Sequence, residues 1–512
     1  MDIVLEHFNP KGYEGDVVLL YGNEVADRAL PLSKKELDWL KANREAFSAD
    51  RQDLTAGKQT DKTCLVRFDR LPYHLYVVCF DGEAPQPVAQ ERLRRAADRV
   101  VQMLKADRPS PSTQGLDAGQ LSVAVTGVGV IAEEVVAFVE GFMLADYAFD
   151  RYKSSKPQHV EKMVVDEAFL SEEELERSVR LWKEIEWCRD CVNLPVADLN
   201  ADLFASQLSQ RADSLGVECT LFDKRKIEAL RMGGLLAVNR GSVDEPRLVV
   251  LEYRPAKPVN ERPLALVGKG VMYDTGGLNI KPDDYMREMK SDMAGAATMA
   301  AVLFAAAENC LPVHLVAVLP LTDNRPGFNA YAADDVLTMY DGSTVEVVNT
   351  DAEGRLILAD AIAYAVACYA PELIIDAATL TGAAVRAIGT YGIAAMQQHA
   401  ENPFNLLRIM GNQVYERIVE LPLWDEYDSL IESDVADIKN CGIAQAGAIT
   451  AGKFLAHFAK QTPYIHLDIA GVAFFSKKQD YYVAGASGYG IRLLYAFLQT
   501  YDMTIGEVRS KN

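Results

Sequence analysis

Between residues 195 and 512, short apolar runs alternate with longer stretches in which apolar residues recur at helical spacing. This alternation constrains the fold most, because parallel strands need a long crossover between them, usually a helix. The expected strands are Leu248–Tyr253, Leu264–Gly268, Val313–Leu319, Val345–Asn349, Leu373–Asp376 and Ile465–Ile469. The expected helices include Met293–Asn309, Leu356–Tyr369 and Ala448–Lys460. The pattern predicts an α/β fold with a mainly parallel sheet that helices cover on both faces.

The rest of the chain predicts a second, smaller domain. At about 150 residues per domain, 512 residues predict two to four domains. Residues 1–165 show mixed strand and helix patterns, and the polar stretch 151–165 suggests a boundary. A capping box at Ser171–Glu174 opens a helix, so residues 166–194 are expected to be a linker helix before the larger domain, 195–512. Gly127–Ala132 resembles a dinucleotide-binding turn, but a plain strand-to-helix turn is the better explanation.

Composition excludes several classes of protein. The chain has 52 Lys and Arg against 73 Asp and Glu, a net charge of −21. Such a surface repels phosphates and anionic lipid, so a nucleic-acid partner is not expected. No apolar run reaches the ~18 residues of a membrane span, and the N-terminus lacks a signal-peptide pattern. A cytoplasmic protein without a membrane partner is expected.

Cysteine and histidine offer no recognisable metal site. The eight cysteines are scattered, which predicts no disulfide framework. The pair Cys188 and Cys191 lacks further ligands nearby and is interpreted as two buried thiols on a helix. The seven histidines are isolated, so a metal would need other ligands.

Three segments place charge next to expected strand ends or helix starts: 267–282, 289–298 and 349–356. Ligands of parallel α/β sheets bind at the carboxyl ends of the strands. If the segments converge there, they bring together four carboxylates, those of Asp274, Asp292, Asp351 and Glu353. Four close anions repel one another unless cations lie among them, and two divalent ions would neutralise them. Each residue has an ordinary alternative, such as a helix cap for Asp292, and spacing alone leaves both interpretations open.

The same segments resemble signature blocks of the leucine aminopeptidase family, the dizinc cytosol aminopeptidases. The run Asn349–Leu356 is the most specific mark, and the likeness covers roughly residues 185–500. Further matching blocks are Arg189-Asp190 with Val192-Asn193, Gly233–Asn239, Asp376–Gly382, Ser433–Asn440, Gly447–Thr450 and His466–Gly471. Residues 1–165 match only in size and αβ character. The resemblance makes 195–512 the expected catalytic domain.

The resemblance implies two divalent ions per subunit, usually zinc, with manganese or magnesium tolerated at the more exchangeable site. By motif position, Lys269, Asp274, Asp292 and Glu353 would hold the tight ion. Asp274, Asp351 and Glu353 would hold the looser one. A lysine ligand needs a neutral amine, and a neighbouring dication would lower its pKa.

The implied reaction is release of N-terminal, leucine-like residues from short peptides that have a free N-terminus, by a water that bridges the two ions. Lys281 would stabilise the developing oxyanion, and Arg355 would hold a bicarbonate ion that acts as general base. The pocket for the first side chain would be lined by Met289, Thr379, Gly382, Ala470 and Ala473. The resemblance also implies a homohexamer, a dimer of trimers, with assembly contacts expected from the N-terminal domain. The alternatives are a two-metal phosphoesterase, a DNA-binding scaffold and an inactive assembly subunit.

Overall fold

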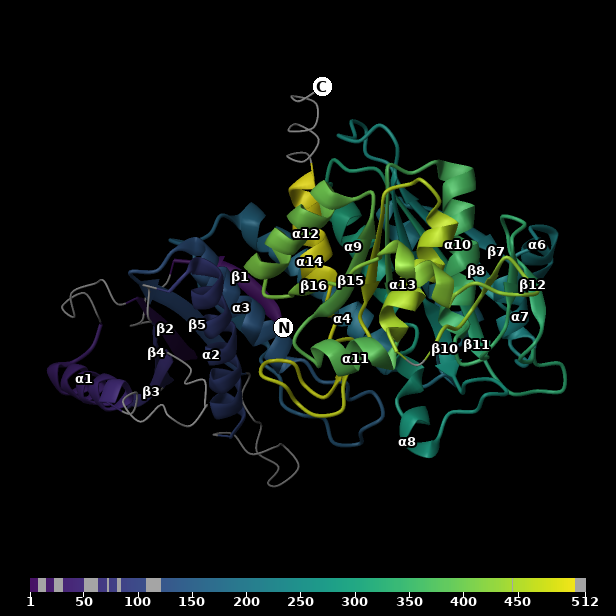
Figure 1. Cartoon of the computed structure of the whole chain (residues 1–512). Coiled ribbons are helices and arrows are strands. Elements are labelled where there is room, and N and C mark those ends of the chain that lie inside the picture. The colour runs from purple at the N-terminus through teal and green to yellow at the C-terminus, as the bar shows by residue number, and fades with distance from the viewer. Residues whose placement is uncertain are drawn as a thin grey trace. The chain divides into compact units, whose positions relative to one another are not determined.

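The computed structural model describes residues 1–7, 15–22, 31–49, 63–70, 73–80, 84–106, 121–443 and 445–501. The chain divides into two compact units, whose elements are labelled in Figure 1. The first unit comprises Met1–Trp182 and Lys477–Ala484, and the second comprises Lys183–Ser476 and Gly485–Asn512. The division falls within α4 (Glu172–Asn193), a helix of 22 residues at the place where the sequence predicts a linker helix.

A six-stranded sheet of order β1-β6-β5-β2-β4-β3 forms the first unit. Its neighbouring strands are parallel except β3 and β4, which form an antiparallel pair. The strands are β1 (Asp2–Glu6), β2 (Asp16–Gly22), β3 (Thr63–Arg70), β4 (Tyr73–Phe80), β5 (Ser122–Val128) and β6 (Lys162–Asp166). The helices are α1 (Lys34–Ala49), α2 (Gln86–Ala106) and α3 (Ala132–Asp146). The dinucleotide-like motif forms the turn between β5 and α3.

Two features of this unit have only weak sequence signals. β6 contains the short apolar run Met163–Val165 inside the stretch that the sequence assigns to a boundary, yet it pairs with both β1 and β5. The segment Lys477–Ala484 comes from far along the chain. Its Lys478 ammonium lies 2.5 Å from an Asp98 carboxylate oxygen, and its Tyr481 hydroxyl donates to Glu91 at 3.0 Å.

The second unit contains a nine-stranded sheet of order β16-β15-β18-β14-β9-β11-β8-β7, with β10 paired to β11. Its centre, β18-β14-β9-β11, is parallel, which confirms the predicted fold class. Its strands are β7 (Glu218–Phe222), β8 (Arg247–Tyr253), β9 (Leu264–Gly268), β10 (Gly270–Asp274), β11 (Leu315–Asn324), β14 (Leu373–Ala378), β15 (Ile393–Gln398), β16 (Ile418–Glu420) and β18 (Tyr464–Asp468). Two small sheets join β12 (Val336–Thr338), β13 (Thr344–Glu346) and β17 (Ile438–Lys439), and β19 (Phe474–Phe475) with β20 (Gly485–Ala486).

Helices pack on both faces of the large sheet, as the buried central strands require. The helices of this unit are α5 (Ala201–Leu215), α6 (Lys224–Ala229), α7 (Gly233–Asn239), α9 (Ala294–Glu308), α10 (Glu353–Tyr369), α11 (Gly382–Ile388), α12 (Glu401–Gln413), α13 (Gly447–Ala459) and α14 (Ile491–Gln499), and the short helix α8 (Asp283–Met286) has no buried residue. Ala265 and Val267 of β9 share a buried core with α7, α10 and α13. Because side chains alternate along a strand, Leu264 and Leu266 point to the opposite face. Helix α9 packs on the sheet as well, and every residue of it up to Ala307 is buried.

Among the predicted strands of the large sheet, Val345–Asn349 differs most from the structure. β13 ends at Glu346 and pairs with β12 and β17, outside the large sheet. After Glu346 the backbone amides bond to other partners: Val347 donates to the Asp335 carbonyl, and Val348 donates to the Asn440 side chain. These bonds end the strand and turn the chain toward α10.

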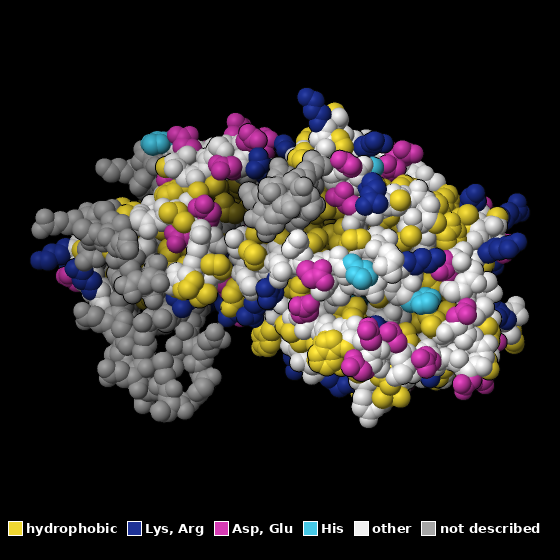
Figure 2. All heavy atoms as spheres, turned by 45° about the horizontal axis from the view of Figure 1, so that its top comes forward, with side chains coloured by type: hydrophobic (Ala, Val, Ile, Leu, Met, Phe, Trp, Pro, Cys, Tyr) yellow, Lys and Arg dark blue, Asp and Glu magenta, His cyan; other side chains and the backbone are white. Residues whose placement is uncertain are grey.

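Two features of the structure concern the membrane and nucleic-acid partners that the sequence disfavours. In the described part of the chain, no helix has the length and apolar character needed to cross a bilayer. On the face drawn in Figure 2, acidic and basic side chains of the described residues are interspersed, without a continuous basic surface.

Candidate active site

The large sheet fixes the first part of the site at the ends of two strands. Lys269 follows β9 directly, and its backbone is held on both sides, because its amide donates to Ala377 of β14 and its carbonyl accepts from Ala296 of α9. Asp274 is the last residue of β10. Its Oδ1 accepts from the Asn324 side chain at 2.9 Å and from the Gly276 amide at 2.8 Å. The two side chains are therefore presented by buried, hydrogen-bonded backbone.

Asp292 lies between the short 3₁₀ helix η4 (Met289–Ser291) and α9. The alternative that it caps α9 is wrong, since the N-cap residue is Met293 and no side chain caps the helix. Its Oδ1 accepts from the Thr379 hydroxyl at 2.7 Å. The carboxylate therefore points away from the helix and toward the loop after β14.

The loop between β13 and α10 supplies Asp351 and Glu353. Glu353 and Arg355 lie in the first turn of α10, which begins three residues before the predicted helix start at Leu356. The preceding residue, Thr350, anchors the loop. Its amide and hydroxyl contact the Asn279 side chain at 2.8 and 3.0 Å, and its carbonyl accepts from the Tyr331 hydroxyl at 2.7 Å.

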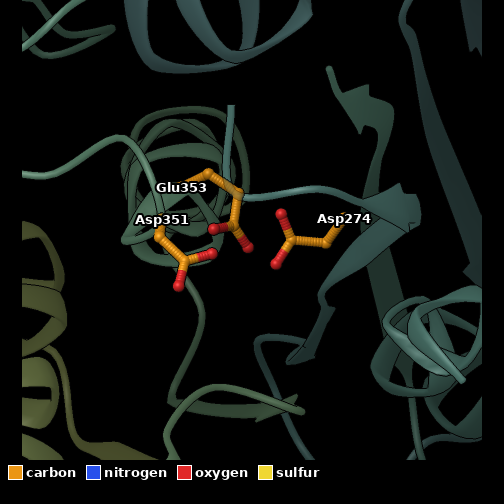
Figure 3. Close-up of side chains that lie close together, drawn as sticks. All are labelled: Asp274, Asp351 and Glu353. Carbon is orange, nitrogen blue, oxygen red and sulfur yellow. The ribbon is translucent and has the colours of Figure 1, made fainter. Parts of the chain in front are cut away.

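These segments bring the predicted ligand residues together. Carboxylate oxygens of Asp274, Asp351 and Glu353 all lie within 4.8 Å of one another, and the three side chains face a common centre in Figure 3. The Lys269 ammonium lies 2.7 Å from Asp292 Oδ1 and 2.8 Å from Glu353 Oε1. The Lys281 ammonium lies 2.7 Å from Asp274 Oδ2 and 2.6 Å from Asp351 Oδ1. Four carboxylates and two lysines thus form one cluster.

The charges of the cluster do not balance. Burial alone would lower the pKa of Lys269 and of Lys281, but the surrounding carboxylates outweigh it and hold both pKa values above their usual range. Burial, together with the neighbouring carboxylates, raises the pKa of Asp351 to about 6 and holds that of Asp292 well above its usual range. Two lysine side chains thus face four carboxyl groups, too few to neutralise all of them.

Unpartnered oxygens show that the cluster suits metal ions. Asp292 Oδ2 and Glu353 Oε2 are buried and accept no hydrogen bond from any described residue. A buried carboxylate oxygen without a donor is costly unless a cation pairs with it. Carboxylate oxygens are also hard ligands of the kind that zinc, manganese and magnesium accept. The residues present therefore fit a divalent metal centre.

Gly354 permits this arrangement. A Cβ at this position would lie 2.5 Å from Lys269 Cε and 2.8 Å from Lys269 Nζ. Lys269 Nζ is held by Asp292, Glu353 and the Thr379 carbonyl, so it cannot move without breaking these contacts. The start of α10 can approach Lys269 only with glycine at this position.

Replacing Gly354 with alanine is therefore expected to displace Lys269 and lower kcat/KM by about 10- to 100-fold, as misplacement of a reactive group by about 1 Å does. Steady-state kinetics on a peptide substrate measure the effect. Gly447→Ala is the matched control, because Gly447 also begins a helix but its Cβ would meet only Ala383 Cβ, at 3.3 Å. Equal activities of the two variants would contradict the role given to Gly354.

A pocket of about 560 Å³ opens beside the cluster. All five residues expected around the first side chain line it: Met289, Thr379, Gly382, Ala470 and Ala473. The expected ligand residues and Lys281 line it as well. The sequence interpretation did not name Tyr285, Val385, Arg386 or Phe474, which also line it. No pattern marks these four, because a contribution to a pocket wall depends on how loops distant in sequence come together.

Arg355 occupies a different position from the other expected residues. It is buried at 7% exposure and is absent from the described residues that line the pocket. Its Nε and Nη1 donate to no described residue. Burial lowers its pKa. The guanidinium thus has buried donors that an anion would satisfy.

Carboxylates and lysines gathered at the strand ends of an α/β domain, beside an open pocket, are typical of hydrolases that bind divalent ions. The family model "Cytosol aminopeptidase family, catalytic domain" matches residues 186–495. The chain therefore belongs to the cytosol aminopeptidase family, and it is an enzyme of that class, a metal-dependent aminopeptidase.

Individual proteins that are similar to this chain support the same family assignment. A probable cytosol aminopeptidase of Syntrophotalea carbinolica is 40% identical over 416 residues, 80% of this chain and 82% of that protein. One of Chlorobaculum tepidum is 45% identical over 383 residues, 72% of this chain and 75% of that protein. Among solved structures, the bottromycin maturation enzyme BotP in complex with Mn is similar with a TM-score of 0.78 at 28% identity, covering 95% of this chain and 100% of that one.

Proposed function

We propose that the enzyme releases N-terminal, leucine-like residues from short peptides with a free α-amine. The observation that carries this proposal is the position of the carboxylate cluster in the wall of a pocket whose other wall is mostly apolar. Met289, Ala470 and Ala473 provide the apolar wall. A free α-amine would offer a basic nitrogen to the metal-loaded cluster, and an apolar first side chain fits the opposite wall.

The cluster would hold two divalent ions, zinc at the tight position and zinc, manganese or magnesium at the exchangeable one. The tight ion would be held by Lys269, Asp274, Asp292 and Glu353, and the looser ion by Asp274, Asp351 and Glu353. The unpartnered oxygens of Asp292 and Glu353 support this assignment. When bound, such ions supply Lewis acidity, which lowers the pKa of water and polarises a peptide carbonyl. Lys269 would act as a ligand in its neutral form.

The chain's own residues would position and stabilise the reacting groups. Hydrolysis adds water to the peptide carbonyl, breaks the C–N bond and leaves a carboxylate and a protonated amine. Lys281 lines the pocket with its ammonium fixed between Asp274 and Asp351, so it is placed to stabilise negative charge on the carbonyl oxygen. Arg355 would hold a bicarbonate ion through Nε and Nη1, and this ion would supply a general base.

The assembly and location of the enzyme are also proposed. We assign residues 1–165 to a domain for assembly contacts, 166–194 to a linker helix and 195–512 to the catalytic domain. The enzyme would be a cytoplasmic homohexamer, a dimer of trimers, without a membrane or nucleic-acid partner. Size-exclusion chromatography with light scattering tests the oligomer, and a mass of one or two subunits would contradict it.

Metal removal and substrate acetylation test the reaction together. The enzyme stripped with a chelator is expected to lose nearly all activity on a leucyl dipeptide amide and to regain it with zinc or manganese. The N-acetylated peptide is expected to remain uncleaved under every condition, because acetylation removes the basic lone pair of the α-amine. Three results would contradict the proposal. They are activity without metal, cleavage of the N-acetylated peptide, and hydrolysis of an aryl phosphate in place of the peptide.

A further inference from the structure

The pocket wall contains an arginine that the proposed reaction does not use. Arg386 lies in α11 and lines the pocket with Gly382, Val385 and Thr381. A Cβ on Gly382 would lie 3.3 Å from Arg386 Nη1, so the guanidinium extends over this glycine. Because Gly382 belongs to the wall proposed to surround the first side chain, the positive charge lies beside that side chain.

Arg386 also differs from the other cations of the pocket. Lys269 and Lys281 each contact two carboxylates. Arg386 is exposed, and it makes no hydrogen bond or ion pair with a described residue. An arginine at the rim of a pocket with all five of its N–H donors available can bind a carboxylate in bidentate fashion. The same wall contains small residues, Gly382, Ala470 and Ala473, which leave space for the methylene groups of a longer side chain.

We propose that Arg386 is a specificity-determining residue that binds the side-chain carboxylate of an N-terminal glutamate, so that the enzyme accepts acidic as well as leucine-like first residues. This inference rests on the proposed aminopeptidase function. The apolar wall contacts the two methylene groups, and Arg386 pairs with the carboxylate at the rim.

Glutamate and glutamine side chains have nearly the same shape. A pair of substrates that differ only in this residue therefore measures the effect of the side-chain charge on kcat/KM. The experiment measures kcat/KM for glutamyl and glutaminyl p-nitroanilide with the metal-loaded enzyme. In Arg386→Gln, the glutamyl-to-glutaminyl ratio is expected to fall by about 3- to 10-fold relative to wild type, the range between an exposed pair and a bidentate one. In Arg386→Glu the ratio is expected to fall further, and a lysyl substrate is expected to gain relative to a glutaminyl one.

Arg225→Gln is the matched control, because Arg225 is an exposed arginine of α6 that is absent from the pocket wall. The ratio is expected to stay at its wild-type value in this variant. An unchanged ratio in Arg386→Gln would overturn the inference while leaving the aminopeptidase function intact. Failure of the wild-type enzyme to cleave leucyl, glutaminyl and glutamyl substrates would instead contradict the proposed function.

A carboxylate can also come from the C-terminus of a dipeptide. Leucyl-glycine and leucyl-glycine amide distinguish this source, because they share the first residue and differ only in the terminal charge. The variant Arg386→Gln is expected to change their ratio by less than about two-fold. A larger loss confined to leucyl-glycine, with the glutamyl ratio unchanged, would overturn the assignment to the first side chain.

Discussion

Replacing Glu353 with glutamine is expected to lower kcat/KM by about 10³-fold and to reduce the bound metal. Glu353 is 1% exposed, its Oε1 lies 2.8 Å from Lys269 Nζ, and its Oε2 has no described donor. The amide keeps the shape but removes the negative charge, and breaking a buried charge pair costs about 3–5 kcal/mol, or roughly 10²–10⁴-fold. Kinetics at saturating zinc and metal analysis after dialysis measure the two effects.

Glu401→Gln provides the matched control for this variant. Glu401 is the first residue of α12, as Glu353 is of α10, but it is exposed and does not line the described pocket. The change should leave kcat/KM and metal content at their wild-type values. Wild-type metal content and activity in Glu353→Gln would contradict the assignment of Glu353 as a metal ligand.

Replacing Lys281 with methionine is expected to lower kcat by about 10²–10³-fold, the usual effect of removing one oxyanion-stabilising group. The loss should lie mainly in kcat rather than KM, because the interaction strengthens only as the carbonyl oxygen becomes charged. Metal content should change much less than in Glu353→Gln, since Lys281 is not among the proposed ligands. Steady-state kinetics at fixed metal concentration separate kcat from KM.

Lys453→Met serves as the control for burying methionine in place of a paired lysine. Lys453 is 9% exposed and lies 2.9 Å from Asp428 Oδ1, away from the described pocket wall. This variant is expected to lose thermal stability but to keep kcat. If Lys281→Met raises KM and leaves kcat unchanged, Lys281 binds the unreacted substrate and does not stabilise the oxyanion.

The sequence predicts those parts of the fold and site that depend on local pattern. β9 begins and ends at the predicted residues, and α9 and α13 begin and end within one residue of the prediction, because each is a continuous apolar element with clear ends. The rule that parallel strands end at one edge places Lys269, which follows β9, and Asp274, which ends β10. Their roles as ligands remain predictions.

Other features depend on contacts that no local pattern encodes. The position of Asp351 comes from the anchoring of Thr350 by Asn279 and Tyr331, residues 71 and 19 positions away. β6 depends on pairing with β1, which is more than 150 residues earlier. Arg386 looks like any exposed helix residue in the sequence, and only its position over Gly382 distinguishes it.

The close backbone contacts around Lys269 indicate how such an enzyme can be redesigned. A Cβ on Gly268 would lie 2.6 Å from Ala296 Cα, and one on Gly295 would lie 2.1 Å from the Ala377 carbonyl oxygen. Together with Gly354, these glycines leave the framework that carries the cluster almost no sequence freedom. In the pocket wall, Gly382 has no comparable contact, because a Cβ there would meet only the end of the Arg386 side chain. A Cβ on Gly471, next to Ala470 of the same wall, would lie 2.3 Å from the Gly389 carbonyl oxygen. Libraries that seek new substrates should therefore vary the side chains that line the pocket and keep the closely packed glycines, Gly471 included, fixed.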